Sequence, residues 1–136
     1  MPRGEPILLD THVLLWWQAG SDRLSAVAHD RLAAAGSILV SPISCWEVGM
    51  LVTRGRVRLD RSTPAWTRDL LAADRVAVAE LTASVAVAAS ELPGFHGDPA
   101  DRFLYATARR RGVPLLTKDR LIHRYAEVDG AVRVIW

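Results

Sequence analysis

The chain has 136 residues, of which 50% are hydrophobic and 24% are charged, and its formal net charge is +2. These values fit one globular domain with a single core, and they exclude a strongly basic nucleic-acid coat. The single cysteine, Cys45, excludes a disulfide framework and a thiolate-rich metal site, and no apolar run approaches the roughly 18 residues of a membrane span. Because the N-terminus also lacks the apolar core of a signal peptide, we expect a cytoplasmic protein without membrane contact.

Short apolar stretches alternate with helical patterns along the whole chain. Stretches that are continuously apolar, or that alternate with polar residues, are predicted to be strands: residues 6–10, 37–41, 75–81, 113–117 and 132–136. Helical patterns cover residues 11–20, 25–35, 44–54, 64–71, 82–92, 98–111 and 120–125. This order predicts one three-layer α/β domain over residues 1–136, with a short, mostly parallel central sheet and helices on both faces.

Local signals predict where several helices begin. Thr11 is expected to cap the first helix, and the segment from Ser44 to Glu47 (SCWE) has the form of a capping box that would start the third. Asp98 followed by Pro99 is a typical N-cap with proline at the first helical position.

Four acidic residues lie at the ends of these elements. Asp10 ends the first strand, Glu47 and Asp101 lie in first turns of helices, and Asp119 ends the fourth strand. Each alone is explained by a turn, a cap or the helix dipole. In a parallel sheet, however, the loops that carry all four acids can lie at the same edge. Like charges about 5 Å apart repel each other there by on the order of 3 kcal/mol per pair. Such a convergence predicts a hard divalent cation held by oxygen ligands, Mg²⁺ or Mn²⁺.

Four motifs together resemble the PIN domain, and more closely the VapC toxins of bacterial toxin–antitoxin pairs. In order, they are residues 8–12 (LLDTH), 41–48 (SPISCWEV), 98–102 (DPADR) and 116–119 (LTKD). The resemblance implies a Mg²⁺-dependent endoribonuclease, with Mn²⁺ as a substitute, that hydrolyses RNA phosphodiester bonds. It also implies a cognate VapB-type antitoxin as a partner, whereas homodimerisation stays open.

The resemblance further implies roles for individual residues. The catalytic and metal-binding quartet would be Asp10, Glu47, Asp101 and Asp119. Asp10 and Asp101 are expected to bind the metal directly, while Glu47 and Asp119 hold its waters or complete a second site. Thr117 matches a position that orients its neighbours by hydrogen bonding. For Asp98, a helix cap and a metal or water contact both stay open.

Basic and aromatic residues near these acids suggest further contacts. Side chains expected to contact the RNA backbone are Arg102, Lys118, Arg120 and Arg124. Tryptophans on neighbouring helices are interpreted as core residues rather than base-stacking platforms: Trp16, Trp17 and Trp46. An apolar set around residues 55–60, including Trp66 and Leu70, matches the region that receives the antitoxin's C-terminal segment in the family.

Two other classes stay open. Receiver and haloacid dehalogenase domains, which transfer phosphoryl groups, also place an aspartate after the first strand. Leu9, however, stands where a receiver needs an acid, and His12 stands where a dehalogenase needs its second aspartate. The other alternative is a catalytically silent PIN module that only binds a partner or RNA.

Overall fold

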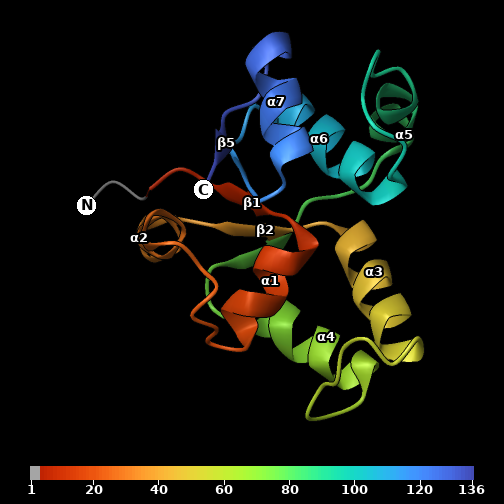
Figure 1. The fold of residues 1–136 in the computed structure, drawn as a ribbon. Coiled ribbons are helices and arrows are strands. Elements are labelled where there is room, and N and C mark those ends of the chain that lie inside the picture. Colours follow the sequence, from red (N-terminus) through yellow and green to blue (C-terminus); the bar gives the residue numbers. More distant parts are fainter. Residues whose placement is uncertain (1–3) are drawn as a thin grey trace.

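The computed structural model describes residues 4–136, which form alternating strands and helices (Figure 1). The strands are β1 (Ile7–Leu9), β2 (Ile38–Val40), β3 (Val76–Val78), β4 (Leu115–Leu116) and β5 (Val134–Ile135). The helices are α1 (Thr11–Gln18), α2 (Ala26–Ala34), α3 (Pro42–Thr53), α4 (Thr63–Ala72), α5 (Ala83–Ser90), α6 (Pro99–Arg111) and α7 (Arg120–Asp129). No helix within residues 4–136 combines the length and the apolar character needed to cross a membrane.

The five strands form one sheet in the order β3-β2-β1-β4-β5, and every pair is parallel. The central strand is β1, whose Leu8 pairs with Leu39 of β2 on one side and with Leu115 of β4 on the other. This sheet confirms the predicted α/β class, and all five predicted strands are present in shortened form.

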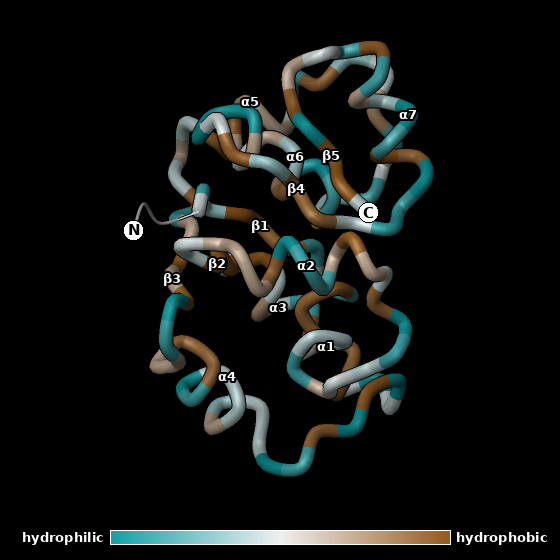
Figure 2. The backbone as a smooth tube through the Cα atoms, turned by 90° about the vertical axis from the view of Figure 1, so that its left-hand side faces the viewer, coloured by the Kyte–Doolittle hydropathy of each residue, from teal (hydrophilic) through white to brown (hydrophobic). Residues whose placement is uncertain are grey.

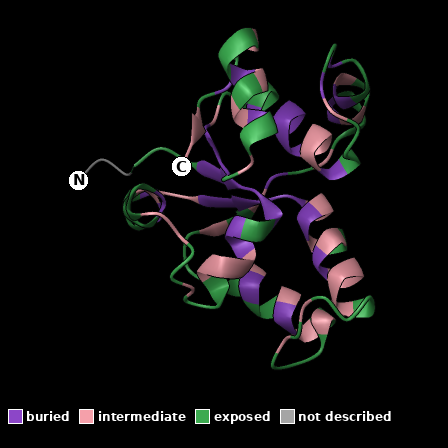
Figure 3. Cartoon of the chain, viewed as in Figure 1, coloured by how far each residue is buried: buried purple, intermediate pink, exposed green. Residues whose placement is uncertain are grey.

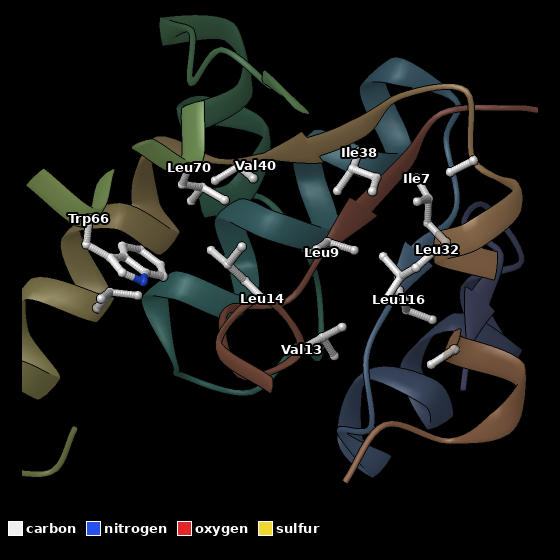
Figure 4. Packing of buried hydrophobic residues seen from close by; sticks show 13 residues of the cluster. Ile7, Leu9, Val13, Leu14, Leu32, Ile38, Val40, Trp66, Leu70 and Leu116 are labelled. Atoms are coloured by element: carbon white, nitrogen blue, oxygen red, sulfur yellow. The ribbon is translucent and has the colours of Figure 1, made fainter. Parts of the chain in front are cut away.

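Side chains of the central strands alternate between two cores. In β1, Ile7 and Leu9 pack with α1, α2 and α4, and Leu116 of β4 joins the same cluster (Figure 4). Leu8, between them, faces the second cluster, which α6 and α7 cover. The strands β1, β2 and β4 are therefore apolar along their length and buried, as the brown segments of Figure 2 and the purple segments of Figure 3 show, whereas the edge strands β3 and β5 are less buried. In Figure 1, α1, α3 and α4 lie on one side of the sheet, and α5, α6 and α7 lie on the other.

The order of the strands reverses beside β1. The chain builds outward from β1 through β2 to β3, and then returns to place β4 and β5 on the other side of β1. Loops that follow β1 and β4 therefore lead to opposite faces of the sheet and leave a crevice between the carboxyl ends of these strands. Asp10 directly follows β1, and Asp119 lies three residues after β4, so the fold delivers both acids to this crevice.

Two predicted helix starts are wrong. The N-cap of α1 is Asp10 rather than Thr11, and α3 begins at Pro42 rather than near Ser44. The Ser41 hydroxyl accepts a hydrogen bond from the Ile43 N–H at 3.1 Å, and proline is favourable at the first helical position, so this start prevails over the capping box. Consequently, the buried Ser44 hydroxyl lies inside the helix, where it accepts a hydrogen bond from Thr11 Oγ1 at 2.9 Å.

Candidate active site

Asp10 is buried at the crevice, with only 7% of its surface exposed. Although it occupies the N-cap position of α1, its side chain makes no capping hydrogen bond. Instead, Oδ2 accepts a hydrogen bond from Thr117 Oγ1 at 2.5 Å. The same threonine oxygen accepts from the Asp119 N–H at 3.0 Å. The buried Thr117 hydroxyl thus connects the acids that follow β1 and β4 by hydrogen bonds.

Asp101 lies in the first turn of α6 and faces a histidine from the preceding loop. His96 Nε2 and Asp101 Oδ2 are hydrogen-bonded at 2.7 Å. The His96 ring stacks on Phe95 with a centroid distance of 4.4 Å. Phe95 is itself buried among aromatic rings, including Tyr105. His96 therefore reaches Asp101 from a packed loop. Sequence analysis left this histidine without a role, and its only local signal was its position five residues before an acid at a helix start.

Asp119 completes a close group. Ligand atoms of His96, Asp101 and Asp119 all lie within 4.8 Å of one another. Asp119 also caps α7, where Oδ1 accepts from the Leu121 and Ile122 N–H groups at 2.8 and 3.1 Å. Both capping bonds use the same oxygen, so this side chain is a cap and a member of the group at once.

Asp98 is exposed at the edge of this group and has a clear local role. It is the N-cap of α6, and its Oδ1 accepts from the Asp101 N–H at 3.2 Å. Pro99 follows at the first helical position, as predicted. Of the two roles considered for Asp98, a helix cap and a metal or water contact, the geometry supports the helix cap.

Glu47 lies in the interior of α3 and is half-buried, outside the close group of His96, Asp101 and Asp119 and outside the lining of the acid cavity described below. Since α3 starts at Pro42, Glu47 lies in its second turn and is not the acid of a capping box. Burial raises the pKa of this carboxyl, and the charges of Asp10 and Asp98 raise it further. Glu47 is therefore within electrostatic range of the other acids.

The acids disfavour one another's ionisation. Burial is the largest cause that raises the pKa of Asp10, and the hydrogen bond from Thr117 only partly offsets it. Burial likewise raises the pKa of Asp101 to about 7, against the opposing hydrogen bond with His96. The charges of Asp10, Asp98 and Asp119 raise it further. A bound cation would relieve this repulsion, because it favours the ionised forms of all these groups.

The donor set fits a hard divalent cation. Asp10, Glu47, Asp101 and Asp119 (the acidic cluster) offer carboxylate oxygens, the ligands that Mg²⁺ and Mn²⁺ prefer. His96 departs from the oxygen-only set that the sequence predicted. Its hydrogen bond to one oxygen of Asp101 is the kind of outer contact that orients a metal-binding carboxylate.

A cavity of about 320 Å³ opens beside the acids. Its lining residues, which define the acid cavity, are Asp10, His12, Val13, Trp16, Lys118 and Asp119. Lys118 is the one basic side chain among these lining residues besides His12, and it is exposed. Trp16 belongs to this cavity rather than to the core, and Trp46 is 56% exposed, so the interpretation of these two as core residues is wrong.

The other basic candidates differ from one another. Arg120 and Arg124 are exposed on α7, and Arg124 lines a separate hollow that also includes His96. Arg102 instead points into the protein. Its guanidinium donates to the carbonyl oxygens of Ala89, Phe95 and His96 at 2.8, 3.0 and 3.1 Å. These bonds make Arg102 an organiser of the loop that carries His96, which corrects its expected role as an RNA contact.

A larger groove of about 610 Å³ lies next to the acid cavity. This arginine groove is lined by His12, Leu15, Trp16, Gln18, Ala19, Arg23, Leu51, Arg56, Val57, Arg58, Leu59, Asp60, Arg61 and Trp66. The apolar set that sequence analysis placed here is only partly at the surface, because Trp66 is 5% and Leu70 is 1% exposed. Both pack in the hydrophobic core cluster (Figure 4).

Comparisons with known proteins agree with this architecture. A model of the PIN domain family matches residues 7–128. Ribonuclease VapC22 of Mycobacterium tuberculosis (strain ATCC 25618 / H37Rv) is 41% identical over 122 residues, which are 88% of this chain and 92% of that protein.

Solved structures show the same fold at low sequence identity. VapC20 of Mycobacterium tuberculosis, described as a sarcin–ricin loop cleaving toxin, has a TM-score of 0.68 at 18% identity, over 96% of this chain and 99% of that chain. The VapBC2 structure from Rickettsia felis, bound to a promoter DNA fragment, has a TM-score of 0.67 at 14% identity, over 95% of this chain and 96% of that chain.

Proposed function

The chain belongs to the PIN domain family, and from this premise we propose that it is a Mg²⁺-dependent endoribonuclease toxin that a VapB-type antitoxin neutralises. The observation that supports this function best is the convergence of Asp10, Asp101 and Asp119 at the strand crevice. Two of these carboxyls have raised pKa values, as expected of an acidic site built for a cation. Membership of the family also removes the receiver and dehalogenase alternatives.

We assign distinct tasks to the acids. Asp10 and Asp101 would hold the metal directly, because neither carboxylate caps a helix. Glu47 and Asp119 would complete its coordination through water or at a second position. Thr117 holds Asp10, and His96 holds Asp101, so both proposed ligands are oriented before a metal arrives. A bound Mg²⁺ supplies activation of water and stabilisation of negative charge on the phosphate.

RNA is the proposed substrate because the 41% identical relative is named a ribonuclease. The chain must also attract a polyanion to an acidic site. Lys118 lies in the acid cavity, and Arg120 and Arg124 lie exposed on the helix that Asp119 caps. These three cations would bind phosphates on either side of the cut bond. Since an RNA substrate and an antitoxin partner would both be present in the cytoplasm, we propose that the protein acts there.

The arginine groove is the proposed antitoxin site. The Rickettsia felis neighbour is a VapBC complex, so its toxin-like fold is one that binds an antitoxin. Arg23, Arg56 and Arg58 line the groove and form no ion pair with a carboxylate among residues 4–136. They would pair with acidic residues of the antitoxin segment. Where the groove meets the acid cavity, a basic side chain of that segment would take the place of the metal's charge.

The test is cleavage of RNA by the purified protein freed of antitoxin. We expect single-stranded or loop RNA to be cut with Mg²⁺ or Mn²⁺, and EDTA to stop the reaction. Asp10→Asn should remove most of the activity, whereas Asp30→Asn, an exposed acid on α2, should not. A wild-type protein that binds antitoxin but cuts no RNA in either metal would instead identify a catalytically silent PIN module.

A further inference from the structure

Two neighbouring tryptophans of α1 have different surroundings. Trp17 packs against the core cluster beneath the helix. Trp16 instead lines both the acid cavity and the arginine groove, and it is half-buried. Its ring contacts Trp136 at a centroid distance of 5.8 Å, at an angle of 57°. Trp16 is therefore a supported aromatic side chain at the surface, and the mechanism proposed above leaves it without a task.

Two cations lie at the same ring. Lys118 Nζ and Arg23 Cζ are each 5.9 Å from the centre of the Trp16 ring. Both side chains are exposed, and neither forms an ion pair within the part of the chain that the structure describes. Each cation is thus held only by a weak contact with the ring and can turn to another anion. An aromatic ring with two available cations close to it suits a group that combines a flat base with flanking phosphates.

We propose that Trp16 is a base-stacking subsite, which binds one unpaired RNA base next to the phosphate that the acids cleave. This inference rests on the proposed function and extends it from the phosphate to the base. Lys118 and Arg23 would exchange their contact with the ring for the phosphates on either side of the stacked base. Because aromatic stacking tolerates every base, the subsite selects unpaired nucleotides rather than a sequence.

The position of Trp16 along α1 agrees with this role. Trp16 lies six residues after Asp10, or about 9 Å along the helix axis at about 1.5 Å per residue. A short stretch of single-stranded RNA spans this distance, so a phosphate can lie at the acids while the adjoining base lies on the ring. RNA is favoured over an antitoxin side chain as the occupant because the ring lines the acid cavity together with Lys118 and Asp119, while Arg23 lines the adjoining arginine groove.

The test separates the contribution of the RNA base to binding affinity from the contribution of the sugar-phosphate backbone. Two fluorescently labelled 12-residue probes are used in Ca²⁺, an oligouridine RNA and an abasic ribose-phosphate strand of the same length. Affinities are measured for the wild type, Trp16→Ala, Trp16→Phe and Trp46→Ala. We expect Trp16→Ala to bind the RNA roughly five- to a hundred-fold more weakly, with unchanged affinity for the abasic strand. Trp16→Phe should recover most of the loss, and Trp46→Ala, an exposed tryptophan outside the acid cavity, should match the wild type.

Three results would overturn the subsite. In the first, Trp16→Ala weakens both probes equally, which means a structural or purely electrostatic effect. In the second, it weakens neither. In the third, RNA affinity is unchanged while antitoxin affinity falls, which assigns Trp16 to the protein interface. If the wild type shows base-dependent binding through Trp16 but cleaves no RNA in Mg²⁺ or Mn²⁺, the subsite stands and the proposed nuclease function fails.

Discussion

The acid cavity and the arginine groove are neighbours with opposite charge. His12 and Trp16 line both, yet one holds Asp10 and Asp119 while the other holds Arg23, Arg56 and Arg58. Asp10 is buried and Asp119 is half-buried, and hydrogen bonds hold both side chains in position, whereas these arginines are exposed. Oriented acids suit a small cation that requires defined geometry. Exposed arginines suit a flexible polypeptide, which they attract without fixing its conformation. The contrast predicts that the two sites can be disabled separately.

The largest expected effect is at the acid cavity. Asp101→Asn keeps the shape of the side chain but removes the charge beside His96 and Asp119. We expect RNA cleavage to fall at least about 100-fold, because a proposed metal ligand is lost. Antitoxin affinity should change much less. Full activity of Asp101→Asn in a cleavage assay would remove the acidic cluster as the active site.

The second expected effect is at the arginine groove. The double variant Arg56→Glu/Arg58→Glu reverses two exposed charges without touching the core. We expect roughly ten- to a hundred-fold weaker antitoxin binding and an unchanged rate of RNA cleavage by the free protein. The matched control is Arg110→Glu, an exposed arginine near the end of α6. Introduction of a charged residue at Trp66 or Leu70 would not serve, since both side chains are buried and the variants would unfold.

The third prediction concerns the metal-free protein. Burial and neighbouring charges raise the pKa of Asp101 from 3.8 to about 7. Between these values the folded state binds more protons than the unfolded state, so the contribution of Asp101 to stability is complete below about pH 4 and is lost as the pH rises through about 7. At pH 8 in EDTA, Asp101→Asn should therefore be more stable than the wild type, by on the order of 1–3 kcal/mol at low salt.

Added Mg²⁺ should reverse that order. The ion stabilises the wild type by about 2.7 kcal/mol at 100 times its Kd, and Asp101→Asn much less. Because the ion competes with a proton on Asp101, the stabilisation should shrink as the pH falls below about 7. Thermal melts with EDTA and with Mg²⁺ measure both effects, and the Arg56→Glu/Arg58→Glu variant is the control that should respond like the wild type. A wild type indifferent to Mg²⁺ would contradict the metal site.

The fourth prediction concerns His96. His96→Ala removes the hydrogen bond that orients Asp101, although the histidine need not touch substrate. We expect about ten-fold weaker Mg²⁺ activation, as is typical for partners of metal-binding carboxylates, and a smaller change at saturating metal. The measurement is the Mg²⁺ dependence of cleavage. A rate that falls equally at every Mg²⁺ concentration would point to a different role for His96.

The smallest expected effect is at Asp98. Its carboxylate accepts from the Asp101 N–H, so Asp98→Ala should cost about 1 kcal/mol of stability, and Asp98→Asn only a few tenths, because asparagine also caps helices. Cleavage by both variants should stay near the wild-type rate. If Asp98→Asn is as inactive as Asp101→Asn, then Asp98 belongs among the metal ligands and the cap is secondary.

Local sequence patterns determined more of the fold than of the site. Continuous or alternating apolar stretches predicted all five strands, because strands that helices cover on both faces of a sheet carry mainly apolar side chains. Asp98 with Pro99, and Asp119 before α7, predicted caps that involve only neighbouring residues. The predicted start of α3 is wrong because two local signals compete. Ser41 with Pro42 starts the helix before the capping box that begins three residues later at Ser44.

Only the tertiary structure decided how side chains far apart in sequence meet. Thr117 joins Asp10 across 107 positions, and the pairing of β1 with β4 sets that contact. Arg102 lies one residue beyond Asp101 in a motif that suggests phosphate binding, yet three carbonyl groups of the preceding loop bind its guanidinium. Trp16 and Trp17 have the same chemistry and adjacent positions, and the rotation of about 100° between consecutive helical residues places one at the acid cavity and the other against the core. A sequence states which groups are available, whereas burial and contact depend on which surfaces the packed sheet and helices bring together.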